Sequence, residues 1–168
     1  MPKKKNMNLT DLLILKLKAL YDTENRLTKA LPKLAKASTD VDLKAAFITH
    51  AAETANHVKR LEKIFQTLDL KPQKTTVEAV QGLVADTDWC IKNISGPAAL
   101  DAALVGAAQY AEHYEIAGYG TALEWAELLD FAGIAQTLEE TLEEEKVTDE
   151  KLSELAHAKL NDRIKIFN

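Results

Sequence analysis

Apolar residues recur at intervals of three and four along four long stretches of the chain, which is the spacing of one face of an α-helix. The clearest stripe lies at about 9–37 and consists of Leu13, Leu17, Leu20, Leu27, Leu31 and Leu34. Similar stripes predict long helices at about 40–68, 97–129 and 131–161, and a shorter stripe predicts an extra helix at about 77–93. The chain is therefore expected to be a set of amphipathic helices.

Capping and breaking residues indicate where these helices begin. Asn8 and Asp130 are suited to cap the first and the last helix, because their side chains accept hydrogen bonds from free backbone amides. With only six glycines and four prolines, and without an alternating strand pattern, the chain is predicted to be all-α. The element order predicts one domain, 1–168, in which four helices form a bundle and a single crossover carries the extra helix.

Two carboxylates interrupt the apolar stripe near the middle of the helix predicted at 97–129. Glu112 and Glu115 are three residues apart and share a face with apolar residues such as Leu104 and Ala122. Burying one ionised carboxylate without a partner costs several kcal/mol or more, and two adjacent ones also repel each other. A bound metal ion is the commonest way to make such a pair stable, so the other helices should supply matching ligands.

The first two helices carry such groups near their middles. Glu24 lies at the centre of the first apolar stripe. In the second helix His50 and His57 occupy core positions, and Glu53 lies on the flank of the same face. Both helices therefore offer metal-binding side chains at mid-helix depth.

The last helix contains a run of acids that its helical phase divides. Glu145 and Asp149 share the phase of the apolar residues, as Leu142 and Leu152 do. The remaining glutamates of the run fall outside that face and are predicted to be solvated: Glu139, Glu140, Glu143 and Glu144. Only part of this charge run is therefore expected to face the core.

Six carboxylates with one or two imidazoles match the ligand set of a pair of iron or manganese ions, provided that the four helices place them at one level. The predicted metal ligands are Glu24, Glu53, Glu112, Glu115, Glu145, Asp149, His50 and His57. Taken singly, a buried acid is usually paired with a cation, and a buried histidine is more often hydrogen-bonded than metal-bound. The available cations lie mostly off the inward faces: Arg26, Lys59, Arg60 and Lys146. The coincidence on four helices favours two metal ions per chain, with the choice of histidine and of bridging carboxylate left open.

Composition narrows the class of protein. With 168 residues, 46% of them hydrophobic, the chain is long enough for one sizeable core. Its single cysteine, Cys90, cannot form an internal disulfide, which fits a cytoplasmic protein. A net charge of -5 argues against general nucleic-acid binding. No apolar run approaches the ~20 residues of a membrane span.

Three segments combine the candidate ligands with distinctive neighbours. They are 109–121 with its Glu112-His113-Tyr114-Glu115 core, the His50-x-x-Glu53-Thr54 motif followed by Val58-x-Arg60-Leu61, and Glu144-Glu145-Lys146-x-x-Asp149-x-Lys151-Leu152. Together they resemble the bacterial YciE/YciF stress-protein family of ferritin-like domains. The resemblance covers about 9–160 and implies a ferritin-like or rubrerythrin-like four-helix bundle with a dinuclear metal centre, and a homodimer. It also implies metal-binding roles for the six acids named above. Ferritin-like sites usually show Glu-x-x-His, whereas here His50 precedes Glu53 by three residues and His57 follows it by four.

Three functions follow as hypotheses. The first is a non-haem dimetal protein of the stress response that reacts with oxygen or peroxide. The second is a mini-ferritin that oxidises and stores iron. The third is a structural or interaction protein in which a metal only holds the helices together.

Overall fold

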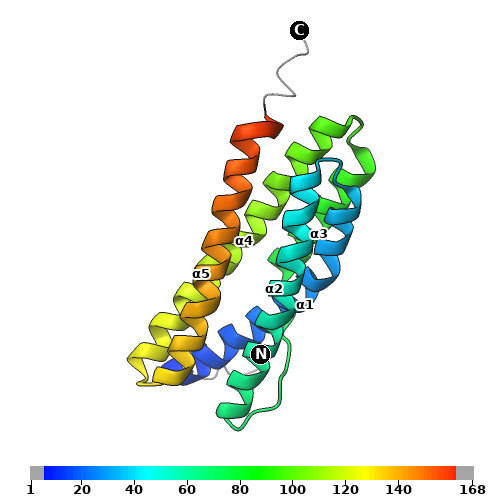
Figure 1. Ribbon diagram of the computed structural model, residues 1–168. Helices are drawn as coiled ribbons and strands as arrows, with labels where there is room; N and C mark the ends of the chain where they lie inside the picture. Colours follow the sequence, from blue (N-terminus) through cyan, green and yellow to red (C-terminus); the bar gives the residue numbers. More distant parts are fainter. Residues whose placement is uncertain (1–5, 162–168) are drawn as a thin grey trace, which may run out of the picture.

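The computed structural model describes residues 6–161, and in this part of the chain every regular element is a helix (Figure 1). Its α-helices are α1 (Leu9–Ala37), α2 (Val41–Thr67), α3 (Glu78–Asn93), α4 (Pro97–Leu128) and α5 (Ala132–Leu155), and a π-helical turn, Ala156–Leu160, follows α5. The predicted all-α class is confirmed. Helix α5 stops six residues before the predicted end at 161, because its last turn changes to π-helical geometry. The predicted domain 1–168 extends past the described residues at both ends.

The helix ends show one correct and one wrong prediction of a cap. Asn8 caps α1, since its side chain accepts from the Asp11 amide at 2.8 Å and its own amide donates to Asp11 at 3.2 Å. Asp130 does not cap α5, whose N-cap residue is Phe131. Asp130 has a φ of 57°, and the Phe131 amide donates to the Ala126 carbonyl at 2.9 Å. This is the left-handed turn that ends a helix, so Asp130 terminates α4.

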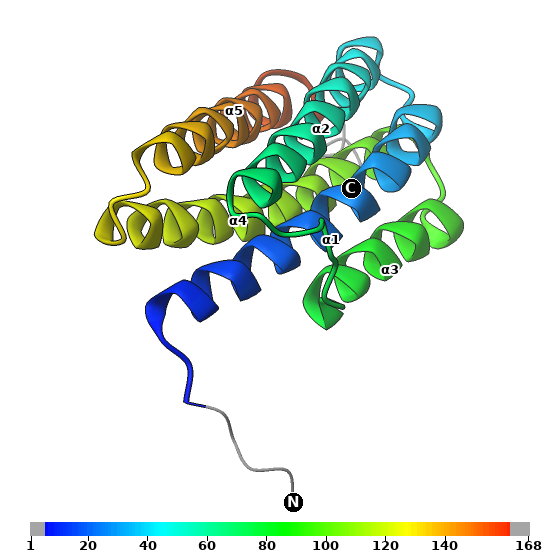
Figure 2. The same ribbon diagram turned by 90° about the horizontal axis from the view of Figure 1, so that it is seen from below.

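The four long helices lie side by side (Figures 1 and 2). Helix α1 packs against α2 and α4, and α5 packs against the same two helices, so that the order around the bundle is α1, α2, α5, α4. The connection from α2 to α4 crosses the bundle and includes α3, which packs on the outside against α1 and α4. Gly118 allows a close approach of α4 to α1, because a Cβ there would lie 2.9 Å from the Leu20 side chain.

The core consists of two apolar layers with a polar layer between them. The first apolar layer is built around Leu13, Leu17, Leu20, Leu61, Phe65, Ala122 and Leu138. The second is built around Leu27, Leu31, Leu43, Phe47, Leu104 and Leu152. On each of the four long helices, buried acids or histidines come between the residues of the first and the second apolar layer. We call these residues the polar layer: Glu24, His50, His57, Glu112, Glu115 and Glu145.

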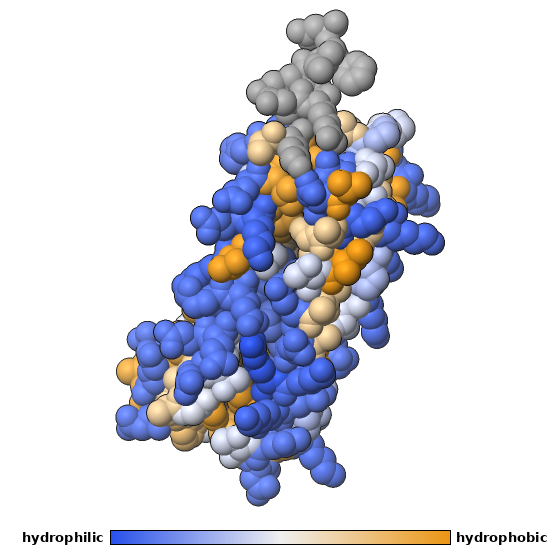
Figure 3. Space-filling model, in the orientation of Figure 1, coloured by the Kyte–Doolittle hydropathy of each residue, from blue (hydrophilic) through white to orange (hydrophobic). Residues whose placement is uncertain are grey.

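The outer surface is mostly polar on the face that Figure 1 presents. Figure 3 shows this face as largely hydrophilic, with small separate hydrophobic areas. None of the helices between residues 6 and 161 combines the length and the hydropathy that a membrane crossing requires.

Candidate metal centre

The six residues of the polar layer are buried inside the bundle. None of its six side chains belongs to a residue that is more than 3% exposed, and Glu24, His57, Glu115 and Glu145 are 0% exposed. Each comes from the middle of its helix: one from α1, two from α2, two from α4 and one from α5. The apolar stripes on either side of each residue hold it at this depth, so the fold brings together acids that are far apart in sequence.

The first cluster of candidate ligands consists of His50, Glu112, Glu115 and Glu145. One ligand atom from each lies within 4.8 Å of the ligand atoms of the others. The Nε2 atom of His50 is 3.2 Å from Oε1 of Glu112 and 3.7 Å from Oε2 of Glu145. Three carboxylates and one imidazole nitrogen are a suitable set for iron or manganese.

The second cluster consists of Glu24, His57 and Glu145. The Nδ1 atom of His57 is 3.0 Å from Oε1 of Glu145 and 3.4 Å from Oε1 of Glu24. Glu145 is thus common to both clusters, and each of its two oxygens faces a different histidine. A carboxylate in this position is suited to bridge two ions.

The polar layer also contains polar atoms that the protein itself leaves unsatisfied. Within residues 6–161, eight buried side-chain oxygen or nitrogen atoms have no hydrogen-bond partner, and all eight belong to these six residues. They include both oxygens of Glu115, both oxygens of Glu145, and the inward nitrogens of His50 and His57. Tyr119 donates a hydrogen bond to Oε1 of Glu24, but Oε2 of Glu24 has no such partner. Unpaired buried lone pairs are expensive, and one or two cations would satisfy them.

The acid–base properties of the layer point to the same need for positive charge. Burial raises the pKa values of Glu24, Glu115 and Glu145, and the Glu115 pKa is raised further by the carboxylates of Glu24, Glu145 and Glu112. Although burial lowers the pKa of a histidine, the adjacent carboxylates raise the pKa of His50 to about 10 and that of His57 to about 11. Without a metal, the layer therefore retains protons that a metal ion would displace.

One prediction of solvent exposure holds only in part. Glu144 was expected in solvent, but its side chain is 38% exposed and its Oε2 lies 2.7 Å from Nε2 of His57. Arg60 donates to both of its oxygens, at 2.6 and 2.8 Å. The Arg60 guanidinium holds the pKa of Glu144 down at about 2, despite partial burial. Helical phase places the Cα atoms of these residues off the inward faces, but their long side chains reach back around the helices.

Two predicted ligands lie at the edge of the polar layer and outside both clusters. The Glu53 side chain is 33% exposed, and its Oε2 is 3.5 Å from Nδ1 of His50. Asp149 accepts a hydrogen bond from Gln109 at 3.2 Å, and its side chain is 19% exposed. A role for either residue as a metal ligand stays a prediction from the sequence.

A small cavity connects the polar layer with the outside of the bundle. It has a volume of about 100 Å³ and lies between α2 and α5. His50, Glu53, Thr148 and Lys151 line its polar part. A molecule with only a few heavy atoms fits this space, and His50 forms part of its wall.

Residues 8–165 match the family described as Domain of unknown function (DUF892). Protein YciF of Escherichia coli strain K12 is 40% identical over 154 residues, which cover 91% of this chain and 93% of YciF. The resemblance noted in the sequence is thereby confirmed as far as YciF is concerned.

Solved structures with the same arrangement of helices include two with substantial sequence identity. The crystal structure of the Escherichia coli stress protein YciF matches with a TM-score of 0.88 and 39% identity, over 93% of this chain and 99% of YciF. YcfI of Rhodopseudomonas palustris, whose description proposes a structural role, matches with a TM-score of 0.87 and 37% identity, over 91% and 98%. A protein from Xanthomonas campestris, with a TM-score of 0.74 and 19% identity over 94% and 97%, supports the fold alone.

Proposed function

The chain belongs to the family described as Domain of unknown function (DUF892), and we propose that it is a ferritin-like dinuclear metal protein. It binds two iron or manganese ions in the polar layer and acts in a bacterial stress response. The similarity to the stress protein YciF supports the biological setting. The ring of four long helices with one crossover supports the ferritin-like architecture.

A single observation carries the metal proposal: Glu145 is shared by two clusters of buried, unsatisfied ligand atoms. The first cluster would hold one ion with His50, Glu112 and Glu115, and the second would hold the other with Glu24 and His57. The donor set of carboxylate oxygens and imidazole nitrogens fits iron or manganese better than a soft-metal site, which would use thiolates. Cys90 lies in α3 and belongs to neither cluster.

Iron or manganese bound here would supply redox chemistry toward oxygen or hydrogen peroxide. The chain's own contribution is to hold the ligands, exclude bulk water and limit access. The two apolar layers seal the polar layer along the bundle axis. The cavity beside His50 admits only a small molecule. Tyr119, which donates to Glu24, fixes the orientation of that carboxylate.

Metal analysis tests the proposal. Protein purified without added metal, then loaded with Mn(II) or Fe(II) without oxygen, should contain about two ions per chain by elemental analysis. Glu145→Gln should lose most of both ions while its helical circular dichroism stays unchanged. Glu143→Gln is the matched control, because Glu143 is an exposed neighbour on the same helix that pairs with Lys146 at 2.6 Å. Full occupancy in Glu145→Gln would contradict the proposal.

The structural role that the description of YcfI proposes gives a second candidate function. In that case the ions hold the four helices together and do no redox chemistry. An optical change on adding hydrogen peroxide to the iron-loaded protein supports the reactive function. No change, together with a large loss of thermal stability on metal removal, supports the structural one.

The oligomeric state distinguishes a homodimer that reacts with oxygen or peroxide from a mini-ferritin that stores iron. We propose a homodimer, which light scattering would report as about twice the chain mass. Cage-sized particles that mineralise iron after aerobic loading would instead indicate a mini-ferritin.

A further inference from the structure

The imidazole of His57 spans two different environments. Its Nδ1 atom faces the second cluster, 3.0 Å from Glu145 and 3.4 Å from Glu24. Its Nε2 atom faces the outside of the bundle and lies 2.7 Å from Oε2 of Glu144. The ring therefore connects a fully buried carboxylate pair with a carboxylate that is partly in solvent.

We propose that Glu144, clamped by Arg60, is the positioning residue for His57: it accepts the Nε2–H hydrogen bond and thereby presents the Nδ1 lone pair to an ion bound in the second cluster. This inference rests on the proposed function, because it treats Nδ1 of His57 as a ligand of an ion bound in the second cluster. It assigns a role to two residues that the sequence pattern places outside the site.

The clamp determines which way the hydrogen bond runs. Arg60 donates from its two terminal nitrogens to the two oxygens of Glu144, at 2.6 and 2.8 Å. One of these nitrogens also donates to the hydroxyl of Thr141 at 3.2 Å, which ties the guanidinium to α5. A carboxylate held in this way is ionised and can only accept, so Nε2 of His57 must donate. A neutral imidazole with its proton on Nε2 has its lone pair on Nδ1.

His50 has the opposite orientation and lacks a clamp. Its Nε2 atom faces the first cluster, 3.2 Å from Glu112. Its outward Nδ1 atom contacts the Thr148 hydroxyl at 3.4 Å and Glu53 at 3.5 Å, both longer than the contact at His57. His50 thus faces the first cluster with Nε2, whereas His57 faces the second cluster with Nδ1. The Arg60–Glu144 pair supports only His57. The ion held by Glu24, His57 and Glu145 is the one that Glu144 should control.

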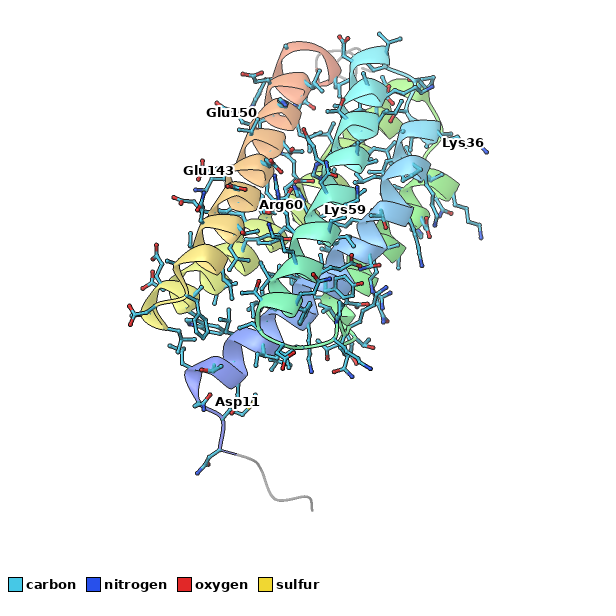
Figure 4. The ribbon with its side chains drawn as sticks, turned by 60° about the horizontal axis from the view of Figure 1, so that its bottom comes forward. Asp11, Lys36, Lys59, Arg60, Glu143 and Glu150 are labelled. Atoms are coloured by element: carbon cyan, nitrogen blue, oxygen red, sulfur yellow. The ribbon has the colours of Figure 1, made fainter. Side chains whose placement is uncertain are left out.

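Figure 4 shows the geometry that makes a matched control available. Arg60 extends from α2 into the space between α2 and α5, whereas Glu143 lies on the outer side of α5. Glu143 pairs with Lys146 at 2.6 Å, and both side chains are about half exposed, at 61% and 48%. Replacing either Glu143 or Glu144 by glutamine removes the same charge from the same helix, but only Glu144 touches a histidine.

The experiment is a titration of metal-free protein with Mn(II), followed by electron paramagnetic resonance of the free ion. Wild type and Glu143→Gln should each bind two ions per chain with the same affinities. Glu144→Gln should bind one of the two about 10- to 100-fold more weakly and leave the other unchanged. Arg60→Lys should weaken the binding of the same ion by a smaller factor, because lysine keeps the charge but not the two-pronged contact. Unchanged affinities in Glu144→Gln would overturn the inference, and absence of Mn(II) binding by wild type would overturn the proposed function itself.

A second measurement needs no substitution and so remains decisive if a variant fails to fold. In wild-type protein loaded with diamagnetic Zn(II) and labelled with ¹⁵N-histidine, the nitrogen chemical shifts report which ring atom holds the proton. His57 should show a protonated Nε2 and a zinc-bound Nδ1, and His50 the reverse. A proton on Nδ1 of His57 would overturn the inference, because Nε2 would then have no proton to donate to Glu144.

Discussion

The polar layer and the two apolar layers lie on the same faces of the same helices. The buried atoms of the apolar layers pack against one another, whereas many buried atoms of the polar layer lack the hydrogen bonds that they require. The apolar layers contain fully buried leucines, including Leu13, Leu17 and Leu104, which are 0% exposed. At equal burial, the polar layer contains eight atoms without hydrogen-bond partners. Apolar packing stabilises a fold, whereas unpaired buried carboxylates destabilise it. The comparison indicates that the apolar layers provide stability and the polar layer provides a binding site.

Weakening the packing of an apolar layer tests most directly whether stability and metal binding are separate roles. Leu17→Ala should lower the free energy of unfolding by about 2–5 kcal/mol, because it leaves a cavity between packed leucines. Urea unfolding followed by circular dichroism measures this, and Leu15→Ala, at a position 45% exposed on the same helix, is the control. The folded variant should still bind two Mn(II) ions per chain. A loss of both ions without a loss of stability would show that the layers are not separate in function.

Metal removal tests the polar layer without changing any of its residues. An ion that binds only the folded state adds about 2.7 kcal/mol to its stability at a free concentration of 100 times Kd. Chelation of Mn(II)-loaded protein should therefore lower the melting temperature by several degrees, and restoring the ion should recover it. A melting temperature that does not respond to Mn(II) would mean that the unsatisfied atoms are not ligands.

Replacing one acid of the polar layer tests whether its oxygens without hydrogen-bond partners destabilise the metal-free fold. Glu115→Met puts an apolar side chain of similar length where both carboxylate oxygens lack partners. The metal-free variant should be more stable than metal-free wild type by roughly 1–2 kcal/mol, toward the low end of the range for replacing buried ionic groups. It should also bind fewer Mn(II) ions. Glu143→Met on the exposed side of α5 should change stability by less than about 0.5 kcal/mol.

The sequence was sufficient for the layers but not for the contacts around them. A period of 3.6 residues places Cβ atoms, so it correctly predicted burial of Glu24, Glu112, Glu115 and Glu145. It does not place the ends of long side chains, which is why the contact between Glu144 and Arg60 was missed. A glutamate and an arginine can each reach several ångströms sideways from the helix that carries them.

Chain reversals were the other source of error. Asp130 suits a cap by residue type, but the backbone reverses there with a positive φ, and it ends α4 instead. The edge positions of Glu53 and Asp149 depend on how α2 and α5 rotate in the bundle, which a stripe of apolar residues defines only approximately.

The smallest predicted effect is a change with pH in how strongly metal stabilises the protein. The pKa values of His50 and His57 rise from 6.5 to about 10 and about 11 in the fold. The stability gained from their charged forms is therefore complete below pH 6.5 and is lost as the pH rises through 10 and 11. Burial raises the pKa values of Glu115 and Glu145 above 4.5, so their contribution is also complete below pH 4.5 and falls as the pH rises.

Metal-free protein should thus lose stability from these groups with rising pH, whereas a metal ion displaces the same protons and binds more tightly as their concentration falls. The difference in melting temperature between Mn(II)-loaded and metal-free protein should be larger at pH 8 than at pH 6. Calorimetry in buffers of different ionisation enthalpy should also show proton release on Mn(II) binding. In Glu115→Met, which lacks one of the titrating carboxylates, the pH dependence should be weaker. A larger difference at pH 6, or proton uptake, would mean that the ion does not replace protons in the polar layer.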